Sequence, residues 1–179
     1  MNFIQKYNRI RKLNRFVLRK RNNGKQVCSW EQAQSICLLY TFETPQLLEE
    51  LMKLISVLKK KKNNITLYCY VQKEDNVLID KQIDVHFLLE KDFDFKGALQ
   101  KEKRLSLRRQ SFDMLINLDR EPSLCSLYLS SEIKAKFRIG RNENYKNYND
   151  IILYSSDERY SFEDYFQFVE KYTERIISE

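Results

Sequence analysis

The side chains best suited to ligand chemistry stand where apolar runs of the sequence end. They form three groups, which are Thr41, Glu43 and Thr44, then Asn117, Asp119, Arg120 and Ser123, and finally Arg141. Hydroxyl, amide and guanidinium groups donate hydrogen bonds, and carboxylates accept them or act as acids and bases. If each run is a strand of a parallel sheet, these groups meet at the carboxyl edge, where open sheets bind ligands. The candidate ligand site is therefore predicted at that edge.

Asp119, in the stretch "FDMLINLDREPS", has two interpretations. It is either an active-site acid at a strand's carboxyl end, or a turn or cap residue that lets the next helix begin. Helix starts near Thr44 and Ser123 would offer backbone N–H groups to an anion. Neither loop contains a glycine, however, and close approach of the backbone to a phosphate usually requires one. The cap interpretation is therefore favoured for both Asp119 and Thr44.

Other catalytic and metal chemistry finds little support in the sequence. His86 follows Asp84 by two residues, which places them on one face of a strand as a base with its orienting carboxylate, although a core histidine is favoured. There is no G-x-S-x-G motif and only one histidine, so we predict no catalytic residue, no metal and no cofactor. The cysteines lack CxxC spacing and are interpreted as reduced thiols of a cytoplasmic protein; they are Cys28, Cys37, Cys69 and Cys125.

The N-terminal 25 residues have a distinct composition. They hold nine Lys or Arg and no acid, which leaves 23 basic and 25 acidic groups in the other 154 residues. Apolar residues recur at helical spacing, namely Phe3, Tyr7, Ile10, Leu13 and Val17. The predicted basic patch is Lys6, Arg9, Lys12, Arg15, Arg19 and Arg21. We therefore predict a basic amphipathic helical arm over 1–25 and an α/β domain over 26–179.

Three roles for the arm remain open on the sequence alone. The apolar stripe can dock on the domain's own sheet or on a partner subunit, which is the favoured role. The helix can instead lie on an anionic membrane surface, or its cations can neutralise phosphates of nucleic acid. The partner is otherwise unknown, and a homo-oligomer is one alternative.

The elements that must position these groups alternate along the chain. Predicted strands cover 35–42, 65–71, 112–118, 135–140 and 151–155, and Gly140, which can take a positive φ, closes the fourth of them. Predicted helices begin at Thr44-Pro45, near residue 98, at Pro122 and at Ser161, where Asp164 completes a capping box. The runs "VLID" and "IDVHFLL" are either one strand each or a hairpin-like pair at the sheet's edge. This alternation predicts a three-layer Rossmann-like α/β domain with a mostly parallel sheet of five or six strands.

The stretches "TPQLLEELMKLISVLKKKKNNITLYCYV" and "FDMLINLDREPSLCSLYLSSEIKAKFRIGR" carry a family resemblance. They resemble the N-terminal Rossmann-like half of the ADP-heptosyltransferase family of glycosyltransferases, over residues 35–141. Most of the chain more closely resembles a family of short uncharacterised bacterial proteins known only as a domain of unknown function. The first resemblance implies the fold, and the second implies no activity.

The sequence departs from the heptosyltransferase pattern where that family does its chemistry. The family has a glycine and an aspartate in the loop after its first strand, and the aspartate is its base. Here the loop reads "LLYTFETP", without glycine; Glu43 does not align with that aspartate, and Tyr40 stands nearer. The second half, which holds the nucleotide-sugar donor, has no room in 179 residues. We therefore do not expect transferase activity.

These observations favour a non-enzymatic binding or adaptor module in the cytoplasm. One alternative is a small enzyme or transferase remnant that binds a nucleotide or phospho-sugar at the strand ends. The other is a peripheral membrane or nucleic-acid binder that acts through the basic arm. No apolar run reaches 18 residues, and arginines interrupt the N-terminus, so neither a membrane span nor a secretory leader is expected.

Overall fold

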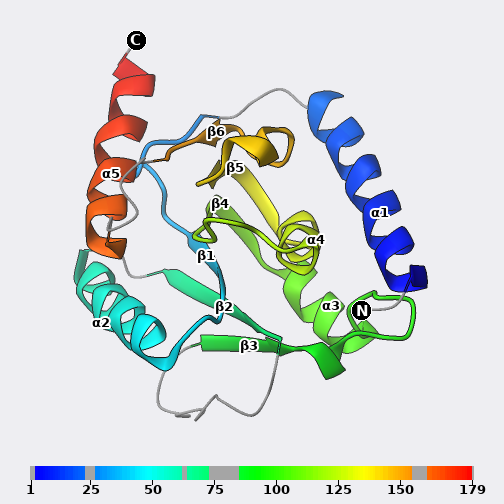
Figure 1. The fold of residues 1–179 in the computed structure, drawn as a ribbon. Helices are drawn as coiled ribbons and strands as arrows, with labels where there is room; N and C mark the ends of the chain where they lie inside the picture. Colours follow the sequence, from blue (N-terminus) through cyan, green and yellow to red (C-terminus); the bar gives the residue numbers. More distant parts are fainter. Residues whose placement is uncertain (1–2, 23–26, 62–63, 73–84, 155–160, 179) are drawn as a thin grey trace.

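The protein is an α/β structure with a six-stranded, all-parallel sheet covered by helices on both sides (Figure 1). The computed structural model describes residues 3–22, 27–61, 64–72, 85–154 and 161–178. The helices are α1 (Phe3–Asn22), α2 (Pro45–Lys61), α3 (Lys101–Arg109), α4 (Leu124–Glu132) and α5 (Phe162–Ser178), with short 3₁₀ turns at Glu90–Asp92 and Glu143–Tyr148. The strands are β1 (Ile36–Thr41), β2 (Ile65–Val71), β3 (Val85–Leu89), β4 (Ser111–Asn117), β5 (Lys134–Gly140) and β6 (Ile151–Ile152).

The strand order is β3-β2-β1-β4-β5-β6, and every neighbouring pair is parallel. The order grows outward in both directions from the middle, so it reverses between β1 and β4. The predicted three-layer fold is confirmed, and Val85–Leu89 of the run "IDVHFLL" form β3, which runs parallel to β2. The run "VLID" lies outside the described residues.

Two hydrophobic cores cover the two faces of the sheet. Side chains alternate along β1, so Leu38 and Tyr40 pack with α2 and α5, whereas Cys37 and Leu39 pack on the face that carries α3 and α4. A strand buried on both faces reads as a continuous apolar run, which is why β1, β2 and β4 were predictable. The predicted caps are present too: Thr44 Oγ1 accepts from Leu47 N, and Ser161 Oγ accepts from Asp164 N.

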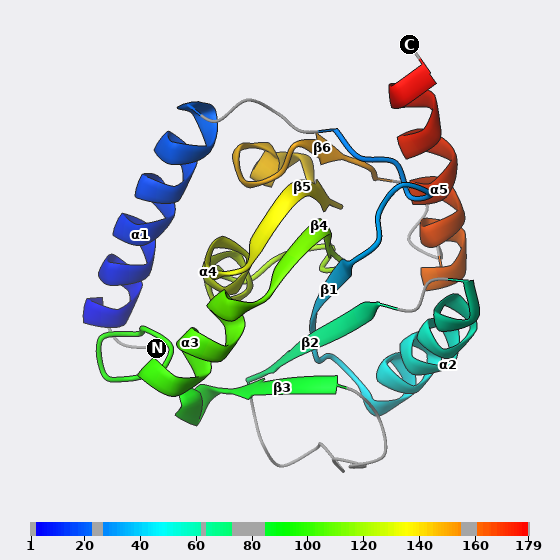
Figure 2. The ribbon, with the colours of Figure 1, turned by 180° about the vertical axis from the view of Figure 1, so that it is seen from behind.

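Helix α1 lies outside α4, on the side of the molecule opposite α2 and α5 (Figures 1 and 2). The face that docks is not the apolar stripe that its spacing suggested. Leu13 is buried, but Phe3, Tyr7 and Ile10 are exposed, and the side chain buried beside Leu13 is Arg9. The docked face therefore mixes an aliphatic and a cationic side chain.

Two glycines differ in what they do. Gly97 has a φ of +74°, and a Cβ there would lie 3.0 Å from Gln5 Cβ and 3.1 Å from Arg9 Nε, so glycine lets α1 approach this loop. The φ of Gly140, in contrast, is not positive. A Cβ at Gly140 would instead lie 2.3 Å from Asn149 Nδ2, so this glycine accommodates a close side chain. None of the helices in the described ranges is both long and apolar enough to cross a membrane.

Candidate functional site

The reversal of strand order between β1 and β4 marks the crevice at which open α/β sheets bind ligands. Asp119 stands there, only 3% exposed. Its Oδ1 accepts from Thr41 N at 2.6 Å, and its Oδ2 accepts from Thr41 Oγ1 at 2.8 Å and from Ser126 Oγ. Asn117 Oδ1 accepts from Asp119 N, and Asn117 Nδ2 lies 3.4 Å from Ser126 Oγ. We call Thr41, Asn117, Asp119 and Ser126 the closed seam, because their polar groups bond to one another.

Asp119 is not the N-cap of α4, and a role for its carboxylate in a ligand site stays a prediction. The N-cap of α4 is Ser123, whose Oγ accepts from Ser126 N at 3.1 Å. Asp119 instead joins the end of β1 to the first turn of α4. Burial raises the pKa of the Asp119 carboxyl, and the hydrogen bonds from Ser126 and Thr41 oppose that rise. The group therefore serves as a buried tie between two elements.

The other predicted ligand residues lie along the same edge without forming one cluster with Asp119. Glu43 and Thr44 are exposed, and Thr44 caps α2. Arg120 is exposed, and its carbonyl accepts from Asn142 Nδ2 at 2.8 Å. The Arg141 guanidinium is half-buried, 4.3 Å from the centre of the Tyr165 ring and 3.4 Å from the Leu118 carbonyl oxygen.

The predicted basic patch is divided between two environments. Lys6, Arg15 and Arg19 are exposed, whereas Lys12 is half-buried and Arg9 is only 1% exposed. The side chain of Arg21 lies outside the described residues. Lys12 Nζ donates to Tyr128 Oη at 3.2 Å and lies 3.9 Å from Glu132 Oε1. Part of the charge of α1 is thus used inside the molecule.

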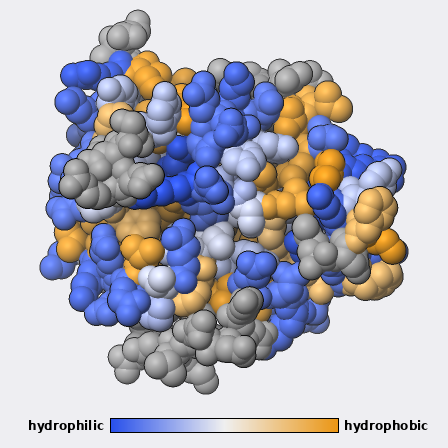
Figure 3. Space-filling model, viewed as in Figure 1, coloured by the Kyte–Doolittle hydropathy of each residue, from blue (hydrophilic) through white to orange (hydrophobic). Residues whose placement is uncertain are grey.

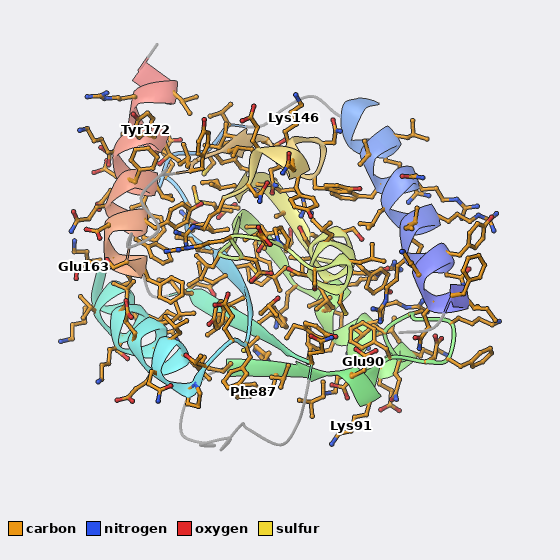
Figure 4. The ribbon with its side chains drawn as sticks, in the orientation of Figure 1. Phe87, Glu90, Lys91, Lys146, Glu163 and Tyr172 are labelled. Atoms are coloured by element: carbon orange, nitrogen blue, oxygen red, sulfur yellow. The ribbon has the colours of Figure 1, made fainter. Side chains whose placement is uncertain are left out.

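Beside the closed seam, on the α4 side of the sheet, the described residues enclose a cleft of about 280 Å³. It draws on α1, the end of β2, the turn after β3 and the start of α4. Its lining residues are Arg9, Tyr70, Gln72, Glu90, Ser123, Leu124 and Cys125. Figure 4 labels Glu90 between the end of β3 and the N-terminal half of α1. We refer to this space as the cleft.

Arg9 is held in the cleft by contacts on several sides. Its Nε donates to the Gly97 carbonyl at 2.9 Å, and its Nη2 lies 4.0 Å from Glu90 Oε1. Its guanidinium lies 4.7 Å from the centre of the Phe93 ring and 5.9 Å from that of Tyr128. Aromatic faces stabilise a desolvated guanidinium, which explains how an arginine can be buried here. The result is a fixed positive charge in the wall of the cleft.

The opposite charge in the cleft belongs to Glu90. Tyr70 Oη donates to Glu90 Oε2 at 2.5 Å, and the Glu90 side chain is 39% exposed. A carboxylate can accept about four hydrogen bonds, so Glu90 has capacity for hydroxyl groups that enter the cleft. Burial raises the pKa of Tyr70, with Cys125 and Glu90 adding to it, so the phenol stays a donor at neutral pH.

The start of α4 adds backbone donors. Leu124 and Cys125 are the first two residues of the helix, and N–H groups of a first turn have no partner within the helix. They suit an anionic group of a ligand, as the helix dipole does. Burial raises the pKa of the Cys125 thiol to about 11, although Arg9 opposes it, so the thiol is protonated at neutral pH. Protonated thiols are poor nucleophiles.

Within the described ranges, no group of three or more His, Cys, Asp or Glu could hold a metal ion. His86 is exposed on β3 and stacks on Tyr68, with ring centres 4.9 Å apart. Asp84, its expected partner, lies outside the described residues. All four cysteines are free thiols, and Cys28 is the one that is not fully buried.

Of the residues that line the cleft, the sequence had indicated Ser123 as a ligand residue and Arg9 as part of the basic patch. It missed Tyr70, Gln72, Glu90, Leu124 and Cys125. Gln72 and Glu90 directly follow β2 and β3, so the strand-end rule that selected Thr41 and Asp119 would have selected them as well. Tyr70 lies within an apolar run and gave no signal.

The comparison with protein families agrees with the expected family of unknown function. The family described as "Family of unknown function (DUF6913)" matches residues 5–176. No curated protein matches the chain significantly. The crystal structure of the glycosyl transferase family 9 from Veillonella parvula DSM 2008 is similar, with 15% sequence identity and a TM-score of 0.47. That similarity covers 83% of this chain and 43% of the transferase, so the chain spans less than half of its length.

Proposed function

Because the chain belongs to the DUF6913 family of unknown function, we propose its function from the geometry of the cleft. The protein is a binding module that holds a small anionic ligand with hydroxyl groups, such as a phosphorylated sugar or a nucleotide, and does not convert it. The observation that carries this proposal is the pair of opposite charges across the cleft, with Arg9 buried at one side and Glu90 partly exposed at the other.

Each part of such a ligand has a complementary group. An anionic group fits against Arg9 and the first N–H groups of α4. Hydroxyl groups fit against the Glu90 carboxylate and the Gln72 amide, which both line the cleft. The ordering of the Arg9 side chain before binding favours affinity, since a pre-organised group loses little conformational entropy on binding.

Two observations support binding without catalysis. The Asp119 carboxylate already accepts from Thr41 and Ser126 and is buried, which is unsuitable for an acid that must reach a substrate. The Cys125 thiol, which does line the cleft, has a raised pKa and is protonated at neutral pH.

Several parts of the sequence prediction stay predictions beside this proposal. They are the division between residues 1–25 and 26–179, a bacterial source and a cytoplasmic location. The four free thiols support a reducing compartment. Arg9 and Leu13 of α1 are buried.

A thermal-shift titration of the intact protein tests the proposal. The panel contains sugar phosphates, nucleotides, the unphosphorylated sugars and inorganic phosphate. A ligand at 100 times its Kd stabilises the protein by about 2.7 kcal/mol, so a phosphorylated ligand should raise Tm by several degrees and its unphosphorylated form by less. Gln72→Ala should reduce the shift, whereas the exposed control Lys53→Ala on α2 should not.

The same samples separate binding from catalysis. Incubation of the protein with each stabilising ligand should leave that ligand chemically unchanged. Turnover of a phosphorylated sugar or nucleotide would show an enzyme instead. If no member of the panel shifts Tm, or if Lys53→Ala and Gln72→Ala reduce the shift equally, the cleft is not the site.

A further inference from the structure

Helix α1 has an outward face that its docking leaves in solvent. Its large apolar residues are Phe3, Ile4, Tyr7, Ile10 and Leu18, which we call the outward stripe; they are between 40% and 84% exposed. Single exposed apolar residues are ordinary on a protein surface, but these lie on one side of one helix. The space-filling view shows hydrophobic and hydrophilic atoms side by side over this side of the molecule (Figure 3).

Cationic side chains lie along the borders of the outward stripe and, at Arg11, within it. Arg11, Arg15 and Arg19 are exposed and four residues apart, so they form one row along the helix. Lys6, also exposed, lies on the other side of the stripe. Helix α1 contains no acidic residue that would neutralise them. The exposed face therefore combines an apolar stripe with a basic border.

The loop beside the first turns of α1 has the same character. Gln5 Nε2 donates to the Asp94 carbonyl at 3.4 Å, and Asn8 Nδ2 donates to the Lys96 carbonyl at 3.3 Å. Phe95 in this loop is 72% exposed, and Lys96 Nζ lies 5.3 Å from the centre of its ring. An aromatic ring and a cation thus stand beside the N-terminal end of the helix.

We propose that the outward face of α1 binds the surface of an anionic lipid bilayer. The apolar stripe enters the boundary between headgroups and acyl chains, and the basic row lies at the level of the lipid phosphates. The interaction is peripheral, and it is independent of the proposed ligand in the cleft because it uses the opposite face of the helix.

Charge and chemistry favour a lipid surface over the other occupants of such a face. A second copy related by two-fold symmetry would place basic helix against basic helix, and α1 has no acid to offset the repulsion. Nucleic acid would neutralise the arginines but would leave Phe3, Ile4 and Leu18 in water. An anionic bilayer satisfies both the apolar stripe and the cations at once.

Co-sedimentation of the full chain with lipid vesicles tests the proposal. The protein should pellet with vesicles of phosphatidylcholine mixed with phosphatidylserine, and far less with phosphatidylcholine alone. The triple variant Arg11→Gln, Arg15→Gln, Arg19→Gln should weaken partitioning by about 100-fold, since each basic group near an anionic surface contributes roughly fivefold. The matched control is Lys59→Gln, Lys60→Gln, Lys61→Gln, which removes three cations from α2 and should leave partitioning unchanged.

A second pair of variants separates the stripe from its charge. Phe3→Asn with Ile10→Asn should reduce vesicle binding while circular dichroism shows an intact fold, because both side chains are exposed. Val57→Asn, at an exposed apolar position on α2, is the matched control and should bind as the wild type does.

Three results would overturn the proposal. The first is failure of the wild type to pellet, or equal pelleting with neutral vesicles. The second is a dimer in sedimentation velocity that Phe3→Asn with Ile10→Asn dissociates, which would make the stripe an interface between copies. The third is retention of single-stranded RNA that depends on the arginines but not on the stripe, without vesicle binding.

Discussion

The closed seam and the cleft both involve the first turn of α4, but the carboxylate of each region has a different solvent exposure. In the seam, Asp119 is buried and accepts from Thr41 and Ser126. The cleft is bordered by Ser123, which precedes Ser126 by three residues, and its Glu90 carboxylate is partly exposed. The position of a carboxylate after a strand therefore does not decide whether it can bind a ligand. The partners it has within the fold decide that.

The difference arises from the elements that each region draws together. The seam is built from the ends of β1 and β4, which are neighbours in the sheet, and from α4, which packs against these strands. The cleft also needs α1 and the turn after β3, and Arg9 reaches Gly97 across 88 residues of sequence. A wall contributed by a separate helix leaves room for a ligand, whereas adjacent strand ends close on each other.

The largest expected effect comes from Arg9→Ala. The change removes a buried side chain that contacts Gly97, Glu90 and two aromatic rings, so it should lower the free energy of unfolding by about 3 kcal/mol. Urea denaturation measures this. Arg15→Ala, exposed on the same helix, should change it by less than about 0.5 kcal/mol.

Arg9→Ala also separates the two regions. In this variant, the Thr41 amide, which donates to Asp119, should still exchange its hydrogen only through global unfolding, because the seam does not include α1. If the Thr41 amide of Arg9→Ala instead exchanges without global unfolding, the seam and the cleft form one cooperative unit, and the distinction between them is wrong.

A smaller effect is expected in the seam from Asp119→Ala. It leaves the Thr41 N–H without its acceptor and opens a small cavity, at a cost of about 2 kcal/mol in unfolding free energy. Asp119→Asn keeps an acceptor for Thr41 N and donors for the two hydroxyls, so it should cost less than about 1 kcal/mol. Equal losses in both variants would show that the negative charge itself holds the seam.

The pH dependence of Asp119→Asn has a definite sign. Burial raises the pKa of Asp119 in the folded state, so above the ordinary value of about 4 the unfolded chain releases a proton that the folded chain retains. The wild type therefore loses stability as pH rises from about 4 through the folded pKa, and the asparagine variant does not. Urea denaturation across this range should show the free energy of unfolding of Asp119→Asn rising relative to that of the wild type. The opposite trend would mean that folding lowers the pKa of Asp119.

Much of the fold was predictable, because burial on both faces leaves continuous apolar runs such as Ile65–Val71. The caps at Thr44 and Ser161 were predictable as well, since they depend on residues three positions away. Gly140 was not. Position 140 requires glycine because the Asn149 side chain lies against it. No local sequence pattern encodes that contact between two elements.

The candidate site was predicted only in part, and α1 explains why. Helical spacing assigns apolar residues to the buried face, so Phe3, Tyr7 and Ile10 were expected there. Arg9 occupies that face because Phe93 and Tyr128, distant in sequence, supply rings for its guanidinium. A charged side chain that is buried by such partners is indistinguishable, in sequence, from one that faces water.

The smallest effect on stability, and the sharpest on binding, is expected from Ser123→Asp. Aspartate is as good an N-cap as serine, so the free energy of unfolding should change by less than about 0.5 kcal/mol, whereas Ser123→Ala should cost about 1 kcal/mol. The new carboxylate borders the cleft where the proposed anionic group lies, so it should abolish the thermal shift caused by a phosphorylated ligand. Ser123→Ala, although less stable, should keep that shift. If Ser123→Asp binds the phosphorylated ligand as the wild type does, the anionic group does not lie at the start of α4, and the cleft must use Arg9 from another direction.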